Sequence, residues 1–279
     1  MLIQHHTVSI KEINYLFPLW LKPEGTETRT LPNIAPDFAK RVSKLTNLTW
    51  DDCIDTPKQG ALDGIVSPKP TQQALFEDRK ERGDLKISFG PRDLFDWIYA
   101  VLHSPAYRAR YADYLKSDFA RIPLPKDRAI FKALVPYGTM LVALHLLDTK
   151  VAPGLTDPKS VRLAGSGDNR VTGKSADFEN DAWAGGRMYI SPSQWFEIVP
   201  ERVANFHIGG YRPARKWLKD RTASGGKRPS PGRVLTTEDI LHYRRMIVAM
   251  DKTIDIMALI DAEIEKHGGW PDAFRGMTD

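Results

Sequence analysis

The apolar residues of this chain recur at helical spacing in its middle third and near its C-terminal end. Between residues 92 and 103 they form one predicted helix face, at Leu94, Trp97, Ile98, Val101 and Leu102. Ser104 and Pro105 fit the N-cap and the first position of a second helix. That second helix is predicted to carry Tyr107, Tyr111, Tyr114 and Leu115.

The longest apolar pattern predicts a long C-terminal helix with one apolar seam. The seam consists of Ile240, Tyr243, Ile247, Met250, Ile254, Met257, Ile260 and Ile264. Thr236 and Asp239 have the spacing of a capping box at its start, and Gly268-Gly269 is typical of a helix end. We expect the seam to pack against another helix, with its methionines filling the core.

Two further helices are predicted. One starts near Pro36, because proline fits a first helical turn and Phe38 and Val42 follow at helical spacing. The other covers about 127–147, and Pro136 is expected to kink or split it because proline lacks the backbone N–H that a helix needs.

Short strands are predicted where β-branched and aromatic residues cluster between turns. These segments are 13–20, 187–190, 194–199 and 205–208, whereas 121–125 is extended and 211–221 is helical. Together the patterns predict an α+β fold. In it, a helical region packs with a small, irregular, mostly antiparallel sheet, and a long helix lies at the C-terminal end.

Segments rich in proline, glycine and charge separate these elements. We expect a connector region at 1–56, a linker at 57–91 and a larger domain at 92–279. Within that domain, 148–186 and 222–233 are predicted loops, the second of them flexible and basic.

Composition is that of a globular chain, since 42% of its 279 residues are hydrophobic. The single cysteine, Cys53, is surrounded by aspartates that disfavour a thiolate, and one cysteine cannot form an internal disulfide. We therefore expect a structural cysteine and a cytoplasmic protein. The sequence shows no signal peptide and no run of 18 apolar residues, so no membrane is expected as a partner.

Positive charge is concentrated in one window. Residues 200–233 contain nine Lys or Arg and two acidic residues, a net charge of +7, although the whole chain carries only +5. The same window contains aromatic rings and the Gly209-Gly210 pair. This combination is typical of a surface that binds a polyanion, most often nucleic acid. The alternative is an ordinary solvated helix and loop.

A second basic region covers 103–133, with seven Lys or Arg and three acidic residues, a net charge of +4. The two regions lie on an otherwise acidic chain, so we expect them to form the two sides of a groove that binds nucleic acid. Ordinary helix-surface charge is the alternative here too.

Catalytic motifs are absent from the sequence. Seven histidines without an HxxxH pair and a single cysteine predict no metal site. The segment 165–169 resembles a nucleotide-binding glycine loop, but no helical pattern follows it, so a turn is predicted. Asp84-Leu85-Lys86 matches only half of a nuclease-type signature, and His145 is predicted to be a core histidine. We therefore expect a binding module, not an enzyme.

Several segments resemble the C-terminal part of Type ISP restriction-modification enzymes. They are residues 96–108 (DWIYAVLHSPAYR), 111–116 (YADYLK), 118–125 (DFARIPLP), 208–211 (IGGY), 216–221 (KWLKDR) and 235–261. Residues 15–20 resemble the stretch that follows the methyltransferase domain in those enzymes.

Type ISP enzymes are single polypeptides with nuclease, helicase, adenine methyltransferase and target-recognition regions in that order. The resemblance implies that this chain is the last part, which recognises a site in double-stranded DNA during phage defence. Its implied partner is a methyltransferase domain or subunit. We expect an excised domain, a truncated gene product or a stand-alone specificity module.

The chain departs from an adenine methyltransferase in two respects. It lacks an Asn-Pro-Pro-Tyr-type catalytic loop and a glycine-rich S-adenosylmethionine site. No cofactor is therefore expected in this chain. S-adenosylmethionine, ATP and Mg²⁺ would belong to other domains of the full enzyme.

The predicted DNA-binding residues come from both basic regions. They are Tyr107, Arg108, Arg121, Lys126, Asn205, His207, Tyr211, Arg212, Arg215, Lys216, Lys219, Arg221, Lys227 and Arg228. The basic residues at 212, 215, 216 and 219 are expected to hold phosphates. Those at 205, 207 and 211 and the 222–233 loop are candidates for base contact.

The arrangement of these residues can also be predicted. The 105–115 helix, the 121–126 turn and the 209–221 segment are expected to line one concave face, with sequence specificity in the loops at 148–186 and 222–233. The alternative is an interaction module that docks a methyltransferase or defence-complex subunit through an exposed C-terminal seam.

Overall fold

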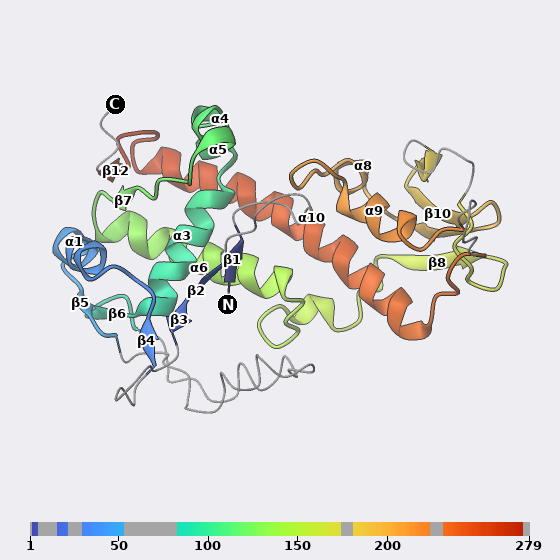
Figure 1. Cartoon of the computed structure of the whole chain (residues 1–279), viewed down its shortest axis with the longest axis horizontal. Coiled ribbons are helices and arrows are strands. Elements are labelled where there is room, and N and C mark those ends of the chain that lie inside the picture. The colour runs from blue at the N-terminus through green and yellow to red at the C-terminus, as the bar shows by residue number, and fades with distance from the viewer. Residues whose placement is uncertain are drawn as a thin grey trace. The chain divides into compact units, whose positions relative to one another are not determined.

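A computed structural model of the chain describes residues 2–4, 16–21, 30–52, 83–173, 181–223 and 231–275 (Figure 1). The chain divides into two compact units. The first comprises Met1–Val142 with Ile256–Asp279, and the second comprises Ala143–Asp255. Cys53, most of the predicted linker, and Lys227 and Arg228 lie outside the described residues.

The first unit is mainly helical. Its elements are β1 (Leu2–Gln4), β2 (Leu16–Pro18), β3 (Trp20–Leu21), β4 (Leu31–Pro32), α1 (Pro36–Thr46), β5 (Thr49–Trp50), β6 (Ser88–Phe89), α3 (Pro91–His103), α4 (Pro105–Arg110), α5 (Tyr114–Ser117), β7 (Leu124–Pro125), most of α6 (Arg128–His145), the end of α10 (Thr237–Lys266) and β12 (Phe274–Arg275). Its strands form two-stranded pairs. Those of β1 with β2, β3 with β4, and β12 with β7 are antiparallel, and that of β5 with β6 is parallel.

Helix α3 forms the centre of the first unit. Leu94, Trp97 and Val101, on its predicted apolar face, are fully buried. Burial extends to its polar residues as well, because Arg92 Nε donates to Asp96 Oδ1 at 2.9 Å and both side chains are buried. This buried ion pair could not be predicted from the apolar spacing.

The second predicted helix is shorter than expected. Ser104 caps α4 as predicted, since its hydroxyl accepts from Tyr107 N at 3.0 Å. The prediction of one helix through Leu115 is wrong, because α4 ends at Arg110 and α5 begins at Tyr114. The backbone leaves helical geometry at Tyr111, the C-cap of α4, which has φ −107° and ψ 21°. The rings of Tyr107 and Tyr111 both contact Trp270, at centroid distances of 5.5 and 6.1 Å.

Helix α6 runs through Pro136 without a split. Proline cannot bond to the carbonyl of residue 132, one turn earlier. Both Lys132 and Pro136 are exposed, so water can satisfy that carbonyl. Of the two predicted effects, the split is wrong, and the kink stays a prediction.

The second unit packs a small sheet against helices. Its elements are the 3₁₀ helix Pro153–Leu155, β8 (Arg162–Gly165), β9 (Trp183–Ala184), β10 (Arg187–Ser191), β11 (Gln194–Glu197), α8 (Glu201–Ala204), α9 (Pro213–Lys219) and α10 up to Asp255. The strand order is β8-β11-β10-β9, and all three pairings are antiparallel. Two of these strands, β8 and β9, lie in the 148–186 segment that was predicted to be loop.

The sheet of the second unit buries one of its faces in the core. Met188 and Ile190 alternate with exposed or half-buried neighbours on β10, as expected for a sheet with one buried face. Phe196 of β11 contacts Tyr243 of α10 at a ring-centroid distance of 4.4 Å. Leu218 of α9 belongs to the same buried cluster. The predicted α+β fold is confirmed.

The C-terminal helix begins and ends close to the predicted residues. Its capping box is present, since Asp239 N donates to Thr236 Oγ1 at 3.1 Å and Thr236 N donates to Asp239 Oδ2 at 3.0 Å. Five seam residues are buried within the chain itself: Tyr243, Ile247, Met250, Ile260 and Ile264. In the second unit this seam packs against both the sheet and α9, and not against a helix alone.

Three smaller predictions have clear outcomes. The chain turns at 166–169 after β8, so the predicted turn is present, and Gly165, the last residue of β8, has a positive φ of 89°. Asp84 has a structural role, because its Oδ1 accepts from the backbone N–H groups of three following residues. His145 has a partner in Thr253 but is exposed, so its prediction as a core residue is wrong. None of the helices in the described ranges is long and apolar enough to cross a membrane.

Candidate nucleic-acid interface

A tight turn at 207–211 presents exposed side chains in the second unit. The backbone of Ile208 pairs with that of Tyr211, with Ile208 N donating to Tyr211 O at 3.0 Å. His207 is exposed, and Ile208 and Tyr211 are 44% and 38% exposed. A Cβ added at Gly210 would meet nothing within 4 Å, so the turn projects into open space. The predicted strand at 205–208 is wrong, because this turn follows α8 directly.

Helix α9 places its basic residues on two different faces. Ala214, Arg215 and Leu218 point into the core, whereas Lys216 and Lys219 are exposed. Arg212 occupies the N-cap position and is half-buried. Of the four residues predicted to hold phosphates, the two lysines are therefore the most accessible.

Arg215 and Asn205 bind each other. Arg215 is only 4% exposed, its Nε donates to Ala204 O at 3.0 Å, and a terminal nitrogen donates to Asn205 Oδ1 at 3.0 Å. Arg215 therefore joins the end of α8 to α9. This burial argues against the direct phosphate contact predicted for Arg215, because helical periodicity turns it toward the core.

The four predicted DNA-binding residues of the first unit also differ in how exposed their side chains are. Tyr107 is 2% exposed, and its hydroxyl donates to Arg121 O at 2.8 Å, so its ring cannot reach a ligand in this structure. Arg108 and Arg121 are exposed and Lys126 is half-buried. The Arg121 guanidinium lies 5.8 Å from the ring centroid of Tyr114. Whether these residues share one face with those of α9 stays a prediction.

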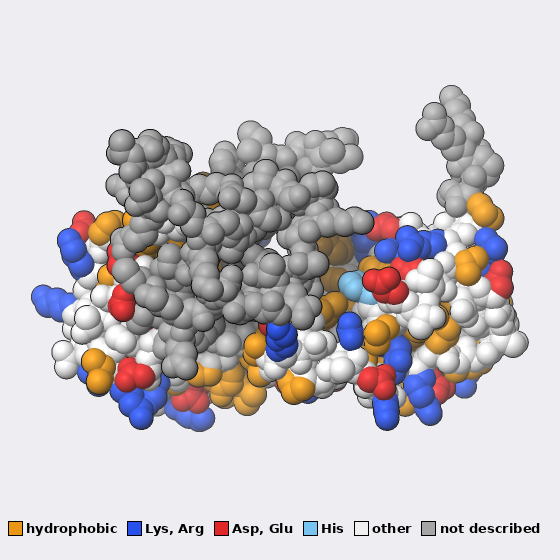
Figure 2. Space-filling view, turned by 90° about the horizontal axis from the view of Figure 1, so that it is seen from below, with side chains coloured by type: hydrophobic (Ala, Val, Ile, Leu, Met, Phe, Trp, Pro, Cys, Tyr) orange, Lys and Arg blue, Asp and Glu red, His pale blue; other side chains and the backbone are white. Residues whose placement is uncertain are grey.

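Much of the basic charge in the 200–233 window is paired with acidic residues. Arg202 contacts Asp251 and Asp255 at 2.7 and 2.6 Å, and Lys216 contacts Asp220 at 2.7 Å. Two of these acids belong to α10, outside the window. On the face that Figure 2 shows, blue Lys and Arg side chains lie beside red Asp and Glu side chains at the right-hand end. The net charge of the window therefore overstates the positive charge of its surface.

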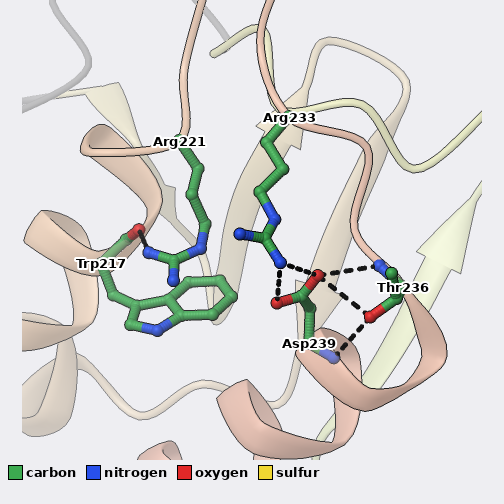
Figure 3. Close-up of polar contacts among 5 residues, drawn as sticks. All are labelled: Trp217, Arg221, Arg233, Thr236 and Asp239. Atoms are coloured by element: carbon green, nitrogen blue, oxygen red, sulfur yellow. Dashed lines mark hydrogen bonds and ion pairs between the residues drawn. The ribbon is translucent and has the colours of Figure 1, made fainter. Parts of the chain in front are cut away.

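A polar cluster lies between the end of α9 and the start of α10 (Figure 3). The Arg221 guanidinium covers the Trp217 ring at 3.6 Å, and Arg233 donates to both carboxylate oxygens of Asp239 at 2.9 and 3.0 Å. Burial alone would raise the pKa of Asp239, but hydrogen bonds from Thr236 and Arg233 hold that pKa below its ordinary value. The sequence prediction included Arg221 and missed the other members.

A signal for this cluster was present in the sequence. Trp217 and Arg221 are four residues apart within the predicted 211–221 helix, a spacing that lets a cation reach an aromatic ring. In the structure α9 ends at Lys219, and Arg221 lies in the turn that follows it. In the ranges that the structure describes, no three His, Cys, Asp or Glu side chains are grouped so as to hold a metal ion.

Comparisons with known proteins identify a matching family and a solved structure with a similar fold. A family model described as the Type ISP C-terminal specificity domain matches residues 1–259. The ATP-dependent Type ISP restriction-modification enzyme LlaBIII bound to DNA matches with a TM-score of 0.53 at 13% identity, over 88% of this chain and 13% of that chain. This match shows a shared fold. No curated protein matches the chain.

Two other solved structures match with lower TM-scores. A nuclease-deletion mutant of the Type ISP enzyme LlaGI with a DNA substrate mimic has a TM-score of 0.46 at 23% identity, over 60% of this chain and 13% of that chain. A DrdV-DNA complex has a TM-score of 0.48 at 19% identity, over 62% of this chain and 18% of that chain. The chain thus spans less than a fifth of each of the three matched chains.

Proposed function

The chain belongs to the Type ISP C-terminal specificity domain family, and from this we propose that it recognises a site in double-stranded DNA for a restriction-modification enzyme. The family match over residues 1–259 carries the proposal. LlaBIII, which shares the fold, is described as bound to DNA. Because the family is a specificity domain, its role is recognition and not catalysis.

The accessible part of the candidate interface supports this function. Lys216 and Lys219 on α9 suit phosphate contacts, which position a protein on DNA. His207 and Tyr211 on the projecting turn suit contacts to base edges. Arg215 acts indirectly in this proposal, because it holds α9 against α8 and so fixes where the two lysines lie.

The remaining parts of the proposal concern the full enzyme. We assign the partner to an adenine methyltransferase domain or subunit, and S-adenosylmethionine, ATP and Mg²⁺ to regions other than this chain. The division into 1–56, 57–91 and 92–279 is kept as part of the same proposal. The interaction-module alternative needs an exposed C-terminal seam, and the five buried seam residues give it no support.

The test is binding of the chain to fluorescently labelled duplexes, measured by anisotropy across a salt series. Non-specific binding is expected at about 50 mM salt, with affinity falling as salt rises because counterions are released from the phosphates. Selection from a random duplex pool should then enrich one sequence. No duplex binding at about 50 mM salt would refute the proposal.

Three variants sharpen the test. Lys219→Gln should reduce the slope of log affinity against log salt by about 0.9, the effect of one phosphate contact. Lys252→Gln is the matched control, since Lys252 is an exposed lysine of α10 outside the candidate interface. Tyr211→Ala should weaken binding to the selected sequence by about 1–3 kcal/mol while leaving binding to random duplex unchanged.

A further inference from the structure

Two arginine side chains face each other beside a cavity in the second unit. The cavity has a volume of about 450 Å³, and Trp217, Arg221, Arg233, Asp239 and His242 are among its lining residues. Figure 3 shows the guanidinium groups of Arg221 and Arg233 side by side, with no interaction drawn between them. Like charges repel, so this arrangement favours an anion close to both groups, and Asp239 supplies one on the Arg233 side.

The backbone holds both arginines in place. Arg233 N donates to Arg221 O at 2.9 Å, and Val171 N donates to Arg233 O at 2.9 Å. Ala223 N donates to Val171 O at 3.2 Å, which fixes the chain on the other side of Arg221. The two ends of the 222–233 segment are thus joined at its base, which fixes the backbone positions from which the two arginine side chains extend.

The two arginines differ in how their charge is compensated. Arg233 is paired with Asp239, whose Oδ2 also accepts two hydrogen bonds from Thr236. Arg221 has the Trp217 ring and the Trp217 carbonyl, to which it donates at 2.9 Å. Its Nε is buried and has no hydrogen-bond partner among the described residues. Burial, and then the neighbouring Arg233, lower the pKa of Arg221, and the carboxylates of Asp239 and Asp220 offset only part of this shift.

A buried donor without an acceptor is unusual, because it forfeits the hydrogen bonds that it made in water. Guanidinium groups suit phosphate oxygens, which they can bind with two parallel N–H donors. Glu238 also lines the cavity, and its carboxylate is exposed. An anion would avoid that side of the cavity, and this preference can be tested directly.

We propose that Arg221, supported by Trp217 and Arg233, binds one phosphate group of the DNA backbone at the base of the 222–233 segment. The inference rests on the proposed function and adds to it a site whose members were mostly not predicted from sequence. It assigns this cluster to positioning the segment on DNA, and not to reading bases. A free nucleotide offers the same phosphate chemistry, and the experiment distinguishes the two sources.

The experiment measures duplex binding of the full chain across a salt series for Arg221→Gln. We expect a loss of affinity of about ten- to hundredfold, the effect of a hydrogen bond to a charged group. The slope of log affinity against log salt should fall by about 0.9. Arg202→Gln is the matched control, because Arg202 is an ion-paired arginine of the same unit that lies outside the cavity lining. Equal behaviour of the two variants would overturn the inference.

Two further variants separate charge from packing and phosphate from base. Arg221→Lys keeps the positive charge and should keep the wild-type slope of log affinity against log salt. A slope as low as that of Arg221→Gln would mean that the loss of affinity comes from packing on Trp217, and it would overturn the inference. Glu238→Gln removes a repulsive carboxylate and should strengthen duplex binding. Weaker duplex binding would instead mean that Glu238 accepts a hydrogen bond from a base amino group. The cluster would then read bases, which contradicts the inference that it only positions the segment.

The source of the phosphate is determined with modified DNA and with ATP. Neutral methylphosphonates, placed one at a time in the duplex, should weaken wild-type binding at one position where Arg221→Gln shows no further loss. If Arg221→Gln abolishes ATP binding and leaves duplex binding intact, the site belongs to a free nucleotide and the inference is wrong. Failure of the wild-type chain to bind any duplex would instead refute the proposed function.

Discussion

Replacing Gly138 by alanine tests how closely α6 approaches α3. A Cβ built on Gly138 would lie 1.9 Å from the carbonyl oxygen of Asp96, 2.5 Å from its carbonyl carbon and 2.9 Å from its Cα. Ordinary contacts begin near 3.4 Å, so the helices would have to separate by about 1.5 Å. These three nearest atoms all belong to the backbone, so no side chain can rotate away to relieve the clash.

Two effects of Gly138→Ala oppose each other. Alanine favours an isolated helix over glycine by about 1 kcal/mol. Overpacking a core costs about 1–3 kcal/mol even where side chains can adjust, and separating α3 from α6 would also loosen the packing around Trp97 and Phe131, whose ring centroids are 5.5 Å apart. Because the clash is with backbone atoms, we take the upper end of the overpacking cost, about 3 kcal/mol. Subtracting the helix preference leaves a net loss of about 2 kcal/mol, which lowers the melting temperature by roughly 4–8 °C in a chain of this size.

The assay is thermal and urea unfolding of the wild-type chain and two glycine variants. Gly210→Ala is the matched control, since its Cβ meets nothing within 4 Å and its stability should change by less than about 0.5 kcal/mol. If Gly138→Ala is as stable as the wild type, the close approach of the two helices is refuted.

Two further predictions concern the elements beside the candidate interface. Tyr243→Phe removes the buried hydroxyl that donates to the Ala214 carbonyl at 3.0 Å, and it should lower the free energy of unfolding in urea by about 1–3 kcal/mol. The matched control is Tyr211→Phe, at an exposed position, which should leave the free energy of unfolding unchanged. Equal effects of the two substitutions on stability would contradict the assigned hydrogen bond. The folded-state pKa of Asp239 is lowered, so its stabilisation exists above the ordinary value of 3.8 and is lost as the pH falls through the folded value. The melting-temperature difference between wild type and Asp239→Asn should therefore be present at neutral pH and close at low pH, and a constant difference would contradict the assigned ion pair.

Local patterns predicted most of the helices because local physics forms them. The apolar face of α3, the Ser104 cap and the capping box of α10 depend only on spacing and on hydrogen bonds between near neighbours. The shared motifs likewise indicated the family that the comparisons confirm. The break after Arg110 was missed, because the spacing from Tyr107 to Leu115 is helical and does not record the non-helical backbone of Tyr111.

The sequence by itself determined the fold class, the family and the position of the basic window. Only the tertiary structure decided which of the basic residues can reach a ligand. Net charge counts Arg215 and Lys219 equally, yet folding buries the first against Ala204 O and leaves the second exposed. Arg202 is matched to Asp251 and Asp255 on α10, because burying the helix seam places their carboxylates within 2.7 Å of its guanidinium. The amino-acid composition sets the net charge. Which basic side chains are exposed, and which pair with acidic residues, depends on which helix faces are buried in the core.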